Sequence, residues 1–425
     1  MFDYARSESF VVDNLRFTHQ GKLYTGKGFM EWNPTTGFEI DAFLDKTFAP
    51  VDGFGTVGQT ILNDRSDTFV IRLGLRNYGS AIVPNVPPLA QKKSIIPDNH
   101  LSLTVKHVVF FQRLPQQFAT DTDSWSGSAM FQIKAELRFP DTLTQETSLA
   151  GQHLETATHS GLSYAEDNGL SITGRNLTEN AYELNWSLPK SHWTKTEAAA
   201  FAEAARKALS IIFAQTIWAA KWNVTRGALQ IYSVRKRKNI ERLSHEFRPL
   251  IDLDFDGPKQ RAFNKSAFID LLKFFIKADS HADIAWRIFY QIADAARRED
   301  WHSRALALSI TLEGALRTLD NHPFKDGDAT WRRKESMLEF QKRYFTEKWT
   351  PACETALKTH TRLRHKNAHP DWLATPNGAL SKDEMKKTIK DLTFLSRFYG
   401  YMILGLAGVK GCEPLFPVVT FNDGA

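Results

Sequence analysis

Apolar and polar residues follow two different periods along this chain. Before residue 240 they tend to alternate with a period of two, in short runs separated by turn residues. This pattern is typical of half-buried strands. We expect strands over residues 26–34, 37–44, 68–75, 107–111, 128–139, 182–188 and 228–234. The segment 82–97, with four prolines, is expected to be a loop. Short strands at this spacing predict a mostly antiparallel sandwich or barrel.

One segment of this β-rich half has a helical period instead. Residues 194–218 are expected to form a helix, with Thr194 or Thr196 as its cap. Its apolar positions form one stripe, made of Phe201, Ala205, Leu209, Ile212 and Ile217.

After residue 263 the apolar period changes to about 3.6 residues, the period of an amphipathic helix. Helices are expected over 266–277, 280–298, 302–319, 331–345, 351–368 and 382–406. Ser280 and Ser381 are the expected caps of the second and the last of them. Met385 and Ile389 are expected in the apolar stripe of the last helix. The fold class is therefore α+β multidomain, with an all-α bundle at the C-terminal end. We expect one domain over 1–255 and a second over 264–412.

Composition narrows the functional classes. The chain has 425 residues, 42% of them hydrophobic and 24% charged, which is typical of a globular protein with two domains. The net charge of +6 weakly favours a polyanionic partner. The two cysteines, Cys353 and Cys412, form no C-x-x-C pair, so neither a disulfide framework nor a zinc ribbon is expected. Without a signal-like start or a long apolar run, we expect a cytoplasmic protein with no membrane segment.

The densest cluster of chemically active side chains is the stretch 362–370, Arg-Leu-Arg-His-Lys-Asn-Ala-His-Pro. Histidine exchanges protons near neutral pH, and arginine binds phosphate with a planar fork. Arg364 and His369 lie five residues apart, so a continuous helix would place them about 140° apart. Pro370 disfavours helical backbone at His369, and a break there brings the imidazole back toward the guanidinium. Asn367 shares the helical face of Arg364.

Two other interpretations fit the same stretch. His365 and His369 have the four-residue spacing of a two-histidine metal site, but a metalloprotease needs Glu directly after the first histidine, where this chain has Lys366. We therefore expect no metal. The stretch also fits a solvated basic helix end, since cations stabilise a helix C-terminus.

The same residues carry a resemblance to a known family. Arg364 and His369 are separated by four residues, with polar His365 directly after the arginine and Asn367-Ala368 before the histidine. This resembles the R-x4-6-H motif of HEPN domains, which lies between long helices. A β-rich region ahead of a C-terminal HEPN domain is similar to the Apea-type proteins of this family. The resemblance covers roughly residues 265–410 and extends only loosely to the N-terminal part.

The resemblance implies a metal-independent endoribonuclease that needs no cofactor. Arg364 and His369 would be catalytic, His365 and Asn367 supporting, and the product a 2′,3′-cyclic phosphate. It also implies an RNA substrate and a homodimer formed through the helical domain. Family members act in bacteria as toxins or in abortive infection against phage. By analogy, the β-rich region would sense a phage-derived trigger or ligand.

Some alternatives stay open at this stage. Glu313 is either an exposed partner of Arg317, four residues on, or a buried carboxylate that orients Arg364 or His365. The run 235–238, Arg-Lys-Arg-Lys, is either a solvated edge or a contact to RNA phosphates. The whole helical domain could also serve as a non-catalytic dimerisation or RNA-binding module. A carbohydrate-binding β domain with a structural helical tail is a third option.

Overall fold

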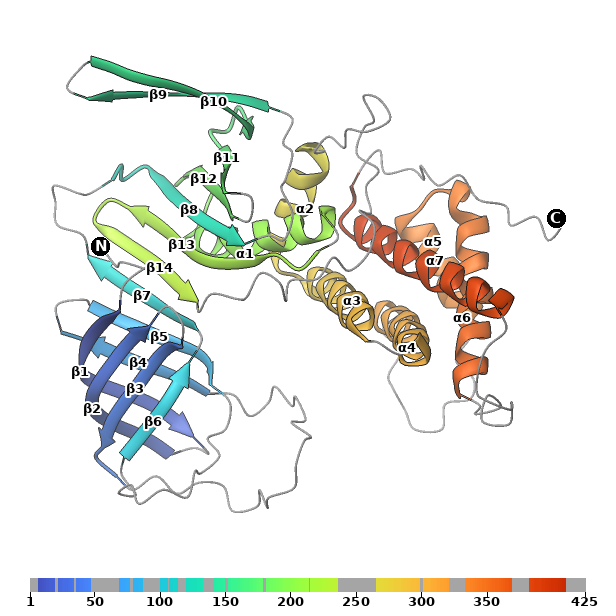
Figure 1. Ribbon diagram of the computed structural model, residues 1–425, viewed down its shortest axis with the longest axis horizontal. Coiled ribbons are helices and arrows are strands. Elements are labelled where there is room, and N and C mark those ends of the chain that lie inside the picture. The colour runs from blue at the N-terminus through green and yellow to red at the C-terminus, as the bar shows by residue number, and fades with distance from the viewer. Residues whose placement is uncertain are drawn as a thin grey trace. The chain divides into compact units, whose positions relative to one another are not determined.

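The structure of the chain is a computed structural model of mixed α+β class, with a large antiparallel sheet and seven α-helices among the described residues (Figure 1). It describes residues 7–19, 22–33, 36–46, 69–76, 79–86, 100–105, 107–113, 120–132, 141–149, 152–178, 181–213, 215–235, 265–298, 301–320, 333–368 and 382–409. The expected domain boundary at 255–264 lies outside these residues. No helix in the described ranges is long and apolar enough to cross a membrane.

The chain divides into two compact units, which are described separately. The first comprises Met1–Gln132, Leu162–Ala202 and Trp218–Asn239, and contains most of the sheet. The second comprises Ile133–Gly161, Glu203–Ile217 and Ile240–Ala425, and contains helices α2 to α7.

The sheet is built from hairpins of antiparallel strands in the order β6-β3-β2-β1-β4-β5-β7-β14-β13-β8-β12-β11-β10-β9. Its strands are β1 Glu8–His19, β2 Lys22–Asn33, β3 Gly37–Leu44, β4 Phe69–Leu75, β5 Gly79–Val86, β6 His100–Val105, β7 His107–Arg113, β8 Ser124–Gln132, β9 Asp141–Leu149, β10 Gln152–Ala165, β11 Ser171–Thr178, β12 Ala181–Pro189, β13 Trp218–Arg226 and β14 Leu229–Arg235. Every strand expected from the alternation is present, although residues 133–139 of the fifth expected strand lie outside the described ranges.

Alternation fixes the register of the first seven strands, because a slip of one residue would turn every apolar side chain outward. Met30 opposes Ile40 and Trp32 opposes Phe38 across β2 and β3, and all four are buried. The same core contains Phe110 of β7, whose ring stacks on Tyr232 of β14 with centroids 4.6 Å apart. Aromatic packing of this kind adds to the stability of the first unit.

Part of the expected loop 82–97 is strand, since β5 extends to Val86. Pro84 in β5 lacks a backbone N–H, and for this reason the sequence predicts a loop there. The pairs that join β5 to β7 involve Ser80, Ala81 and Ile82. Pro84 lies beyond that ladder, so its missing donor leaves those hydrogen bonds intact.

Helix α1, Lys195–Ile212, begins with a capping box. The backbone N–H of Glu197 donates to Thr194 Oγ1 at 3.2 Å, and the N–H of Thr194 donates to Glu197 Oε2 at 2.8 Å. Thr194, rather than Thr196, is therefore the cap. The expected C-terminal end at 218 is too late, because Trp218 begins β13. In the first unit, Phe201 stacks on Trp186 of β12 with ring centroids 4.6 Å apart.

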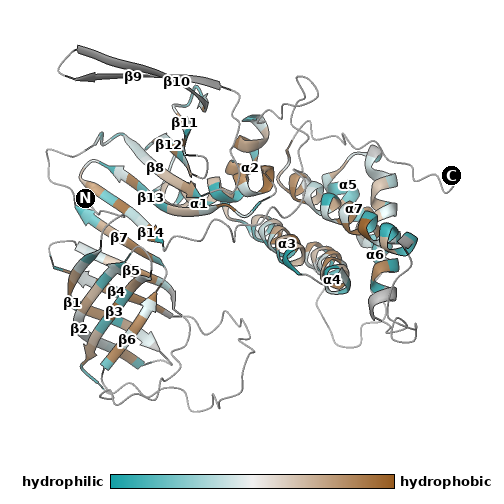
Figure 2. Cartoon of the chain, in the orientation of Figure 1, coloured by the Kyte–Doolittle hydropathy of each residue, from teal (hydrophilic) through white to brown (hydrophobic). Residues whose placement is uncertain are grey.

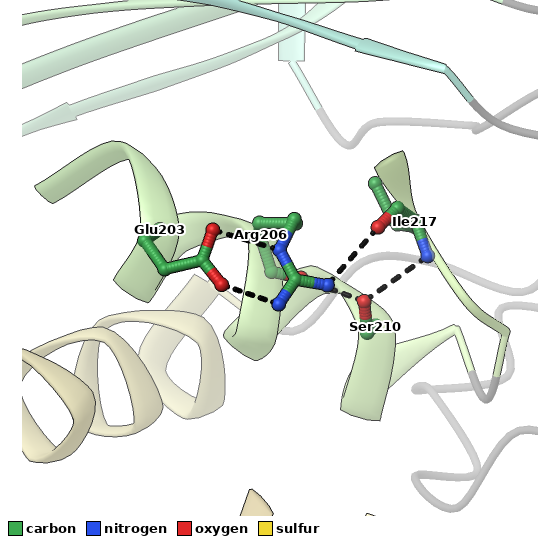
Figure 3. Close-up of polar contacts among 4 residues, drawn as sticks. All are labelled: Glu203, Arg206, Ser210 and Ile217. Atoms are coloured by element: carbon green, nitrogen blue, oxygen red, sulfur yellow. Dashed lines mark hydrogen bonds and ion pairs between the residues drawn. The ribbon is translucent and has the colours of Figure 1, made fainter. Parts of the chain in front are cut away.

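Arg206 is a buried cation whose groups all find partners in the second unit (Figure 3). Its Nε donates to Glu203 Oε2 at 3.0 Å, and its Nη1 donates to the carbonyl of Ile217 at 3.2 Å. Ser210 Oγ accepts from the N–H of Ile217 at 3.2 Å, which fixes the turn after the helix. The guanidinium also lies over the ring of Trp286, 4.6 Å from its centroid. These contacts offset the desolvation of the charge.

Apolar and polar residues are mixed along the remaining helices (Figure 2), and most of the apolar residues described there are buried. They are α2 Lys265–Lys277, α3 Ser280–Arg297, α4 Trp301–Leu319, α5 Arg333–Tyr344, α6 Thr350–Ala368 and α7 Lys382–Leu406, which agree with the expected helices to within two residues at each end. Helices α4 and α7 contact each other, and each also contacts α3, α5 and α6, so these two helices form the centre of the bundle.

Two local expectations in the bundle are wrong. The cap of α3 is Asp279, whose carboxylate accepts from the N–H of Ala282 at 2.9 Å, and Ser280 is already inside the helix. Met385 and Ile389, expected in the buried stripe of α7, are 47% and 56% exposed. The buried positions of these turns are Thr388 and Asp391. Ser381 lies outside the described residues.

A pair of glycine substitutions tests this packing. A Cβ at Gly28 of β2 would lie 2.0 Å from the backbone oxygen of Asp41, so Gly28→Ala must separate two paired strands. We expect it to lower the free energy of unfolding by about 2 to 3 kcal/mol. A Cβ at Gly314 of α4 meets nothing within 4 Å. Gly314→Ala should therefore be neutral or stabilising by up to about 1 kcal/mol. Urea unfolding of both variants measures the difference, and equal destabilisation would contradict the register.

Candidate active site at the end of α6

The basic stretch occupies the last turns of α6, where the bundle brings three helices together. Helix α6 contacts both α4 and α7. Leu363, between the two arginines, is buried at 1% exposure and directs this part of α6 into the core. Arg362 and Arg364 flank it and reach toward neighbouring helices. His365 and Asn367 lie within α6, where the structure describes their backbone only. His369 lies outside the described residues.

Arg364 forms an ion pair with Glu313 of α4, through its Nη1 and the Oε2 of the carboxylate. The side chain of Glu313 is only 15% exposed, whereas that of Arg364 is 39% exposed. The carboxylate therefore lies at the edge of the core, and the guanidinium extends from it into solvent. This contact corresponds to the orienting arrangement considered for Glu313.

Glu313 also contacts Arg317, one turn further along α4, with 3.4 Å between Oε1 and Nη2. Both expected partners are thus present, one on each carboxylate oxygen. Two guanidinium groups around one carboxylate leave the cluster Glu313–Arg317–Arg364 with a net charge of +1. An anion such as a phosphate is attracted to this residual charge, most strongly at the exposed edge of Arg364.

Arg362 pairs with a different carboxylate, Asp391 of α7. Its Nε donates to Asp391 Oδ2 at 2.9 Å, and its Nη2 donates to Oδ1, so the contact is bidentate. Asp391 is 8% exposed. The pair joins α6 to α7 as the Glu313–Arg364 pair joins α6 to α4. The end of α6 is therefore held from two sides.

The role of Asp391 was missed in the sequence, although a signal was present. Thr388, Asp391, Leu395 and Phe398 are spaced three, four and three residues apart, which is a helical stripe continuous with the core. An acidic residue in such a stripe needs a cationic partner. Because Met385 and Ile389 are apolar, the sequence predicts that they are buried, whereas the buried face of the helix contains Thr388 and Asp391.

A further reactive side chain on α6 is the thiol of Cys353. Cys353 is 2% exposed, and burial raises the pKa of its thiol to about 12. A thiol with this pKa stays protonated at neutral pH, and it is the thiolate that acts as a nucleophile. Cys353 is therefore not a candidate nucleophile.

No family model, curated protein or solved structure matches this chain.

The Glu313 cluster makes a measurable contribution to stability. Glu313→Gln removes the counter-charge of two arginines at a site that is largely shielded from solvent, and we expect a loss of about 1 to 2 kcal/mol in the free energy of unfolding. Glu339→Gln on α5 is the matched control, because Glu339 also pairs with two cations, Lys342 at 3.2 Å and Arg343 at 3.9 Å, but on an exposed face. The control should change stability by less than about 0.5 kcal/mol. Urea unfolding compares them, and an equal effect would argue against the buried pairing.

Proposed function

We propose that this protein is a metal-independent endoribonuclease of the HEPN type. The proposed arrangement is a sandwich-like or barrel-like β region over 1–255, which regulates a HEPN-like helical nuclease domain over 264–412. We further propose that it is a bacterial effector of abortive infection or a toxin, and that its β region responds to a phage-derived trigger. The biological setting rests on resemblance of the motif alone.

One observation supports the chemical part of this proposal more than any other. Arg364, the arginine of the motif, is held through its Nη1 by Glu313, and its side chain remains 39% exposed. A positioned but accessible guanidinium is the group needed to bind a scissile phosphate. His369 follows it by five residues in the chain, directly before Pro370.

The proposed reaction uses the nucleophile that RNA itself carries, the 2′-hydroxyl. This oxygen attacks the adjacent phosphorus, and the bond from phosphorus to the 5′-oxygen of the next nucleotide breaks. His369 either accepts the proton of the 2′-hydroxyl or donates one to the departing 5′-oxygen. Arg364 stabilises the negative charge that accumulates on the phosphoryl oxygens. The products are a 2′,3′-cyclic phosphate and a 5′-hydroxyl. His365 and Asn367 would support substrate binding.

A homodimer through the helical domain is part of the proposal. Two copies related by a twofold axis would bring two sets of Arg364 and His369 to one RNA-binding cleft. Each copy would supply one cation, Arg364, and one proton-transfer group, His369, to this cleft. This arrangement comes from the resemblance to the family.

The main alternative is a non-catalytic dimerisation or RNA-binding module. It is favoured by the fact that Arg362 and Arg364 both pair with carboxylates from neighbouring helices. Helix packing alone would then explain why these arginines are present. In that case the chain would bind RNA through the basic stretch without cleaving it.

The decisive experiment incubates mixed RNA with the parent protein, Arg364→Ala and His369→Ala. We expect each substitution to lower the cleavage rate by about 100-fold or more, the usual contribution of a positioned acid–base group or of a charge stabiliser. End-group analysis should find 2′,3′-cyclic phosphates in the parent reaction. Cleavage should continue in excess EDTA, since no metal takes part.

The matched controls are Arg298→Ala and His192→Ala, an exposed arginine of the helical unit and an exposed histidine of the β-rich unit. Both should cleave as the parent does. If Arg364→Ala and His369→Ala fold and cleave RNA at the parent rate, the assignment to this motif is wrong. Binding of RNA without cleavage, with or without phage infection of the expression host, would favour the non-catalytic alternative.

A further inference from the structure

The outer face of the β2–β3 hairpin carries two large aromatic side chains in solvent. Phe29 of β2 and Phe43 of β3 are 58% and 59% exposed. Strand alternation places them there, because their neighbours Met30, Ala42 and Leu44 are buried in the core on the other face. Exposed phenylalanines are unfavourable in water, and two of them on adjacent strands call for an explanation.

The strand register places the two rings close together. Phe29 lies directly opposite Asp41, and Phe43 lies directly opposite Lys27. Phe29 and Phe43 are therefore diagonal neighbours on one face, a separation of about 7 to 8 Å in a twisted antiparallel pair. Phe43 also packs against the His100 ring of β6, with centroids 4.9 Å apart. The two rings form a small aromatic platform with Lys27 beside it.

Charge on this face is distributed unevenly. Glu31 and Glu39 oppose each other at the end of the hairpin near its turn. Asp41 is paired with His100 at 2.5 Å, which offsets its charge when the imidazole is protonated. At the other end, Arg16 of β1 lies directly opposite Arg72 of β4, and both are exposed.

The two arginines form an unusual pair. Like charges directly opposite each other on neighbouring strands are destabilising. Neither guanidinium is ion-paired to a carboxylate within the part of the chain that the structure describes. Arg16 opposes Thr25, two residues before Lys27 on β2. The cations Arg72, Arg16 and Lys27 therefore follow one another next to the aromatic platform. Two exposed carboxylates lie beside them, Asp13 near Lys27 and Asp45, which accepts from Thr25 Oγ1.

We propose that this outer face of β1 to β4 binds single-stranded RNA. Unpaired bases would stack on Phe29 and Phe43, and the backbone phosphates would lie along Lys27, Arg16 and Arg72. Aromatic rings flanked by a line of cations are the combination with which proteins bind single strands. The choice of RNA as the polyanion rests on the proposed function.

The same features disfavour other occupants. Bases in a duplex are stacked on each other and offer no free ring face to Phe29 or Phe43. A purely apolar partner would leave the Arg16–Arg72 repulsion in place, whereas phosphates relieve it. A neutral sugar would use the rings but not the cations.

Binding is tested in the His369→Ala protein, so that cleavage does not obscure it, by fluorescence anisotropy with a short labelled single-stranded RNA. Adding Phe29→Ala and Phe43→Ala should weaken binding about 10-fold for each ring removed. Tyr290→Ala is the control, because Tyr290 of α3 is an equally exposed aromatic residue at 56%. It should leave the affinity unchanged. Arg16→Gln with Arg72→Gln should reduce the salt dependence of log K by about 0.7 per cation.

Three results would overturn the inference: unchanged RNA binding in the folded double phenylalanine variant, equal binding of duplex RNA, or tighter binding of DNA of the same sequence. Circular dichroism checks that each variant is folded. Failure of this inference and failure of the proposed function give different results. If the parent cleaves RNA but the phenylalanine variants bind normally, only this inference fails. If the platform binds RNA that the parent never cleaves, only the nuclease assignment fails.

Discussion

The candidate site depends on one interaction, the contact between Glu313 of α4 and Arg364 of α6. A carboxylate at the edge of a core is stable only with a counter-charge, and an exposed arginine is mobile unless something fixes it. Each side chain meets the need of the other. Arg317 completes the arrangement, since it shares Glu313 and leaves the cluster with excess positive charge.

A second carboxylate extends this constraint. Asp391 binds Arg362 from α7, so the two arginines on either side of buried Leu363 are tied to different helices. Helical geometry favours this division, because residues two apart point about 160° away from each other. Both side chains remain partly exposed, at 41% for Arg362 and 39% for Arg364. The two arginines therefore differ in the helix to which each is tied, and not in their exposure.

Local patterns predicted the secondary structure well where the apolar period was strong. The strand Gly37–Leu44 and the helix Lys382–Leu406 have the expected bounds. Seven strands were not expected, namely β1, β5, β6, β9, β10, β11 and β13. In β9, β10 and β11 many positions are threonine, serine or glutamine, so the alternation of apolar residues is weak there. Asp279 was passed over as a cap because Ser280 offered an equally suitable oxygen one residue later.

The sequence by itself determined the helices of the C-terminal half and the strands with a strong apolar alternation, and it placed Arg364 near the end of a helix before His369 and Pro370. These features depend on neighbours within a few residues, so they can be read along the chain. Only the tertiary structure decided that Glu313 holds Arg364 as well as Arg317, and that α7 buries Asp391 instead of Ile389. Glu313 and Arg364 are 51 positions apart in the sequence, and Arg362 and Asp391 are 29 apart. A helical period cannot show which of such distant side chains will meet.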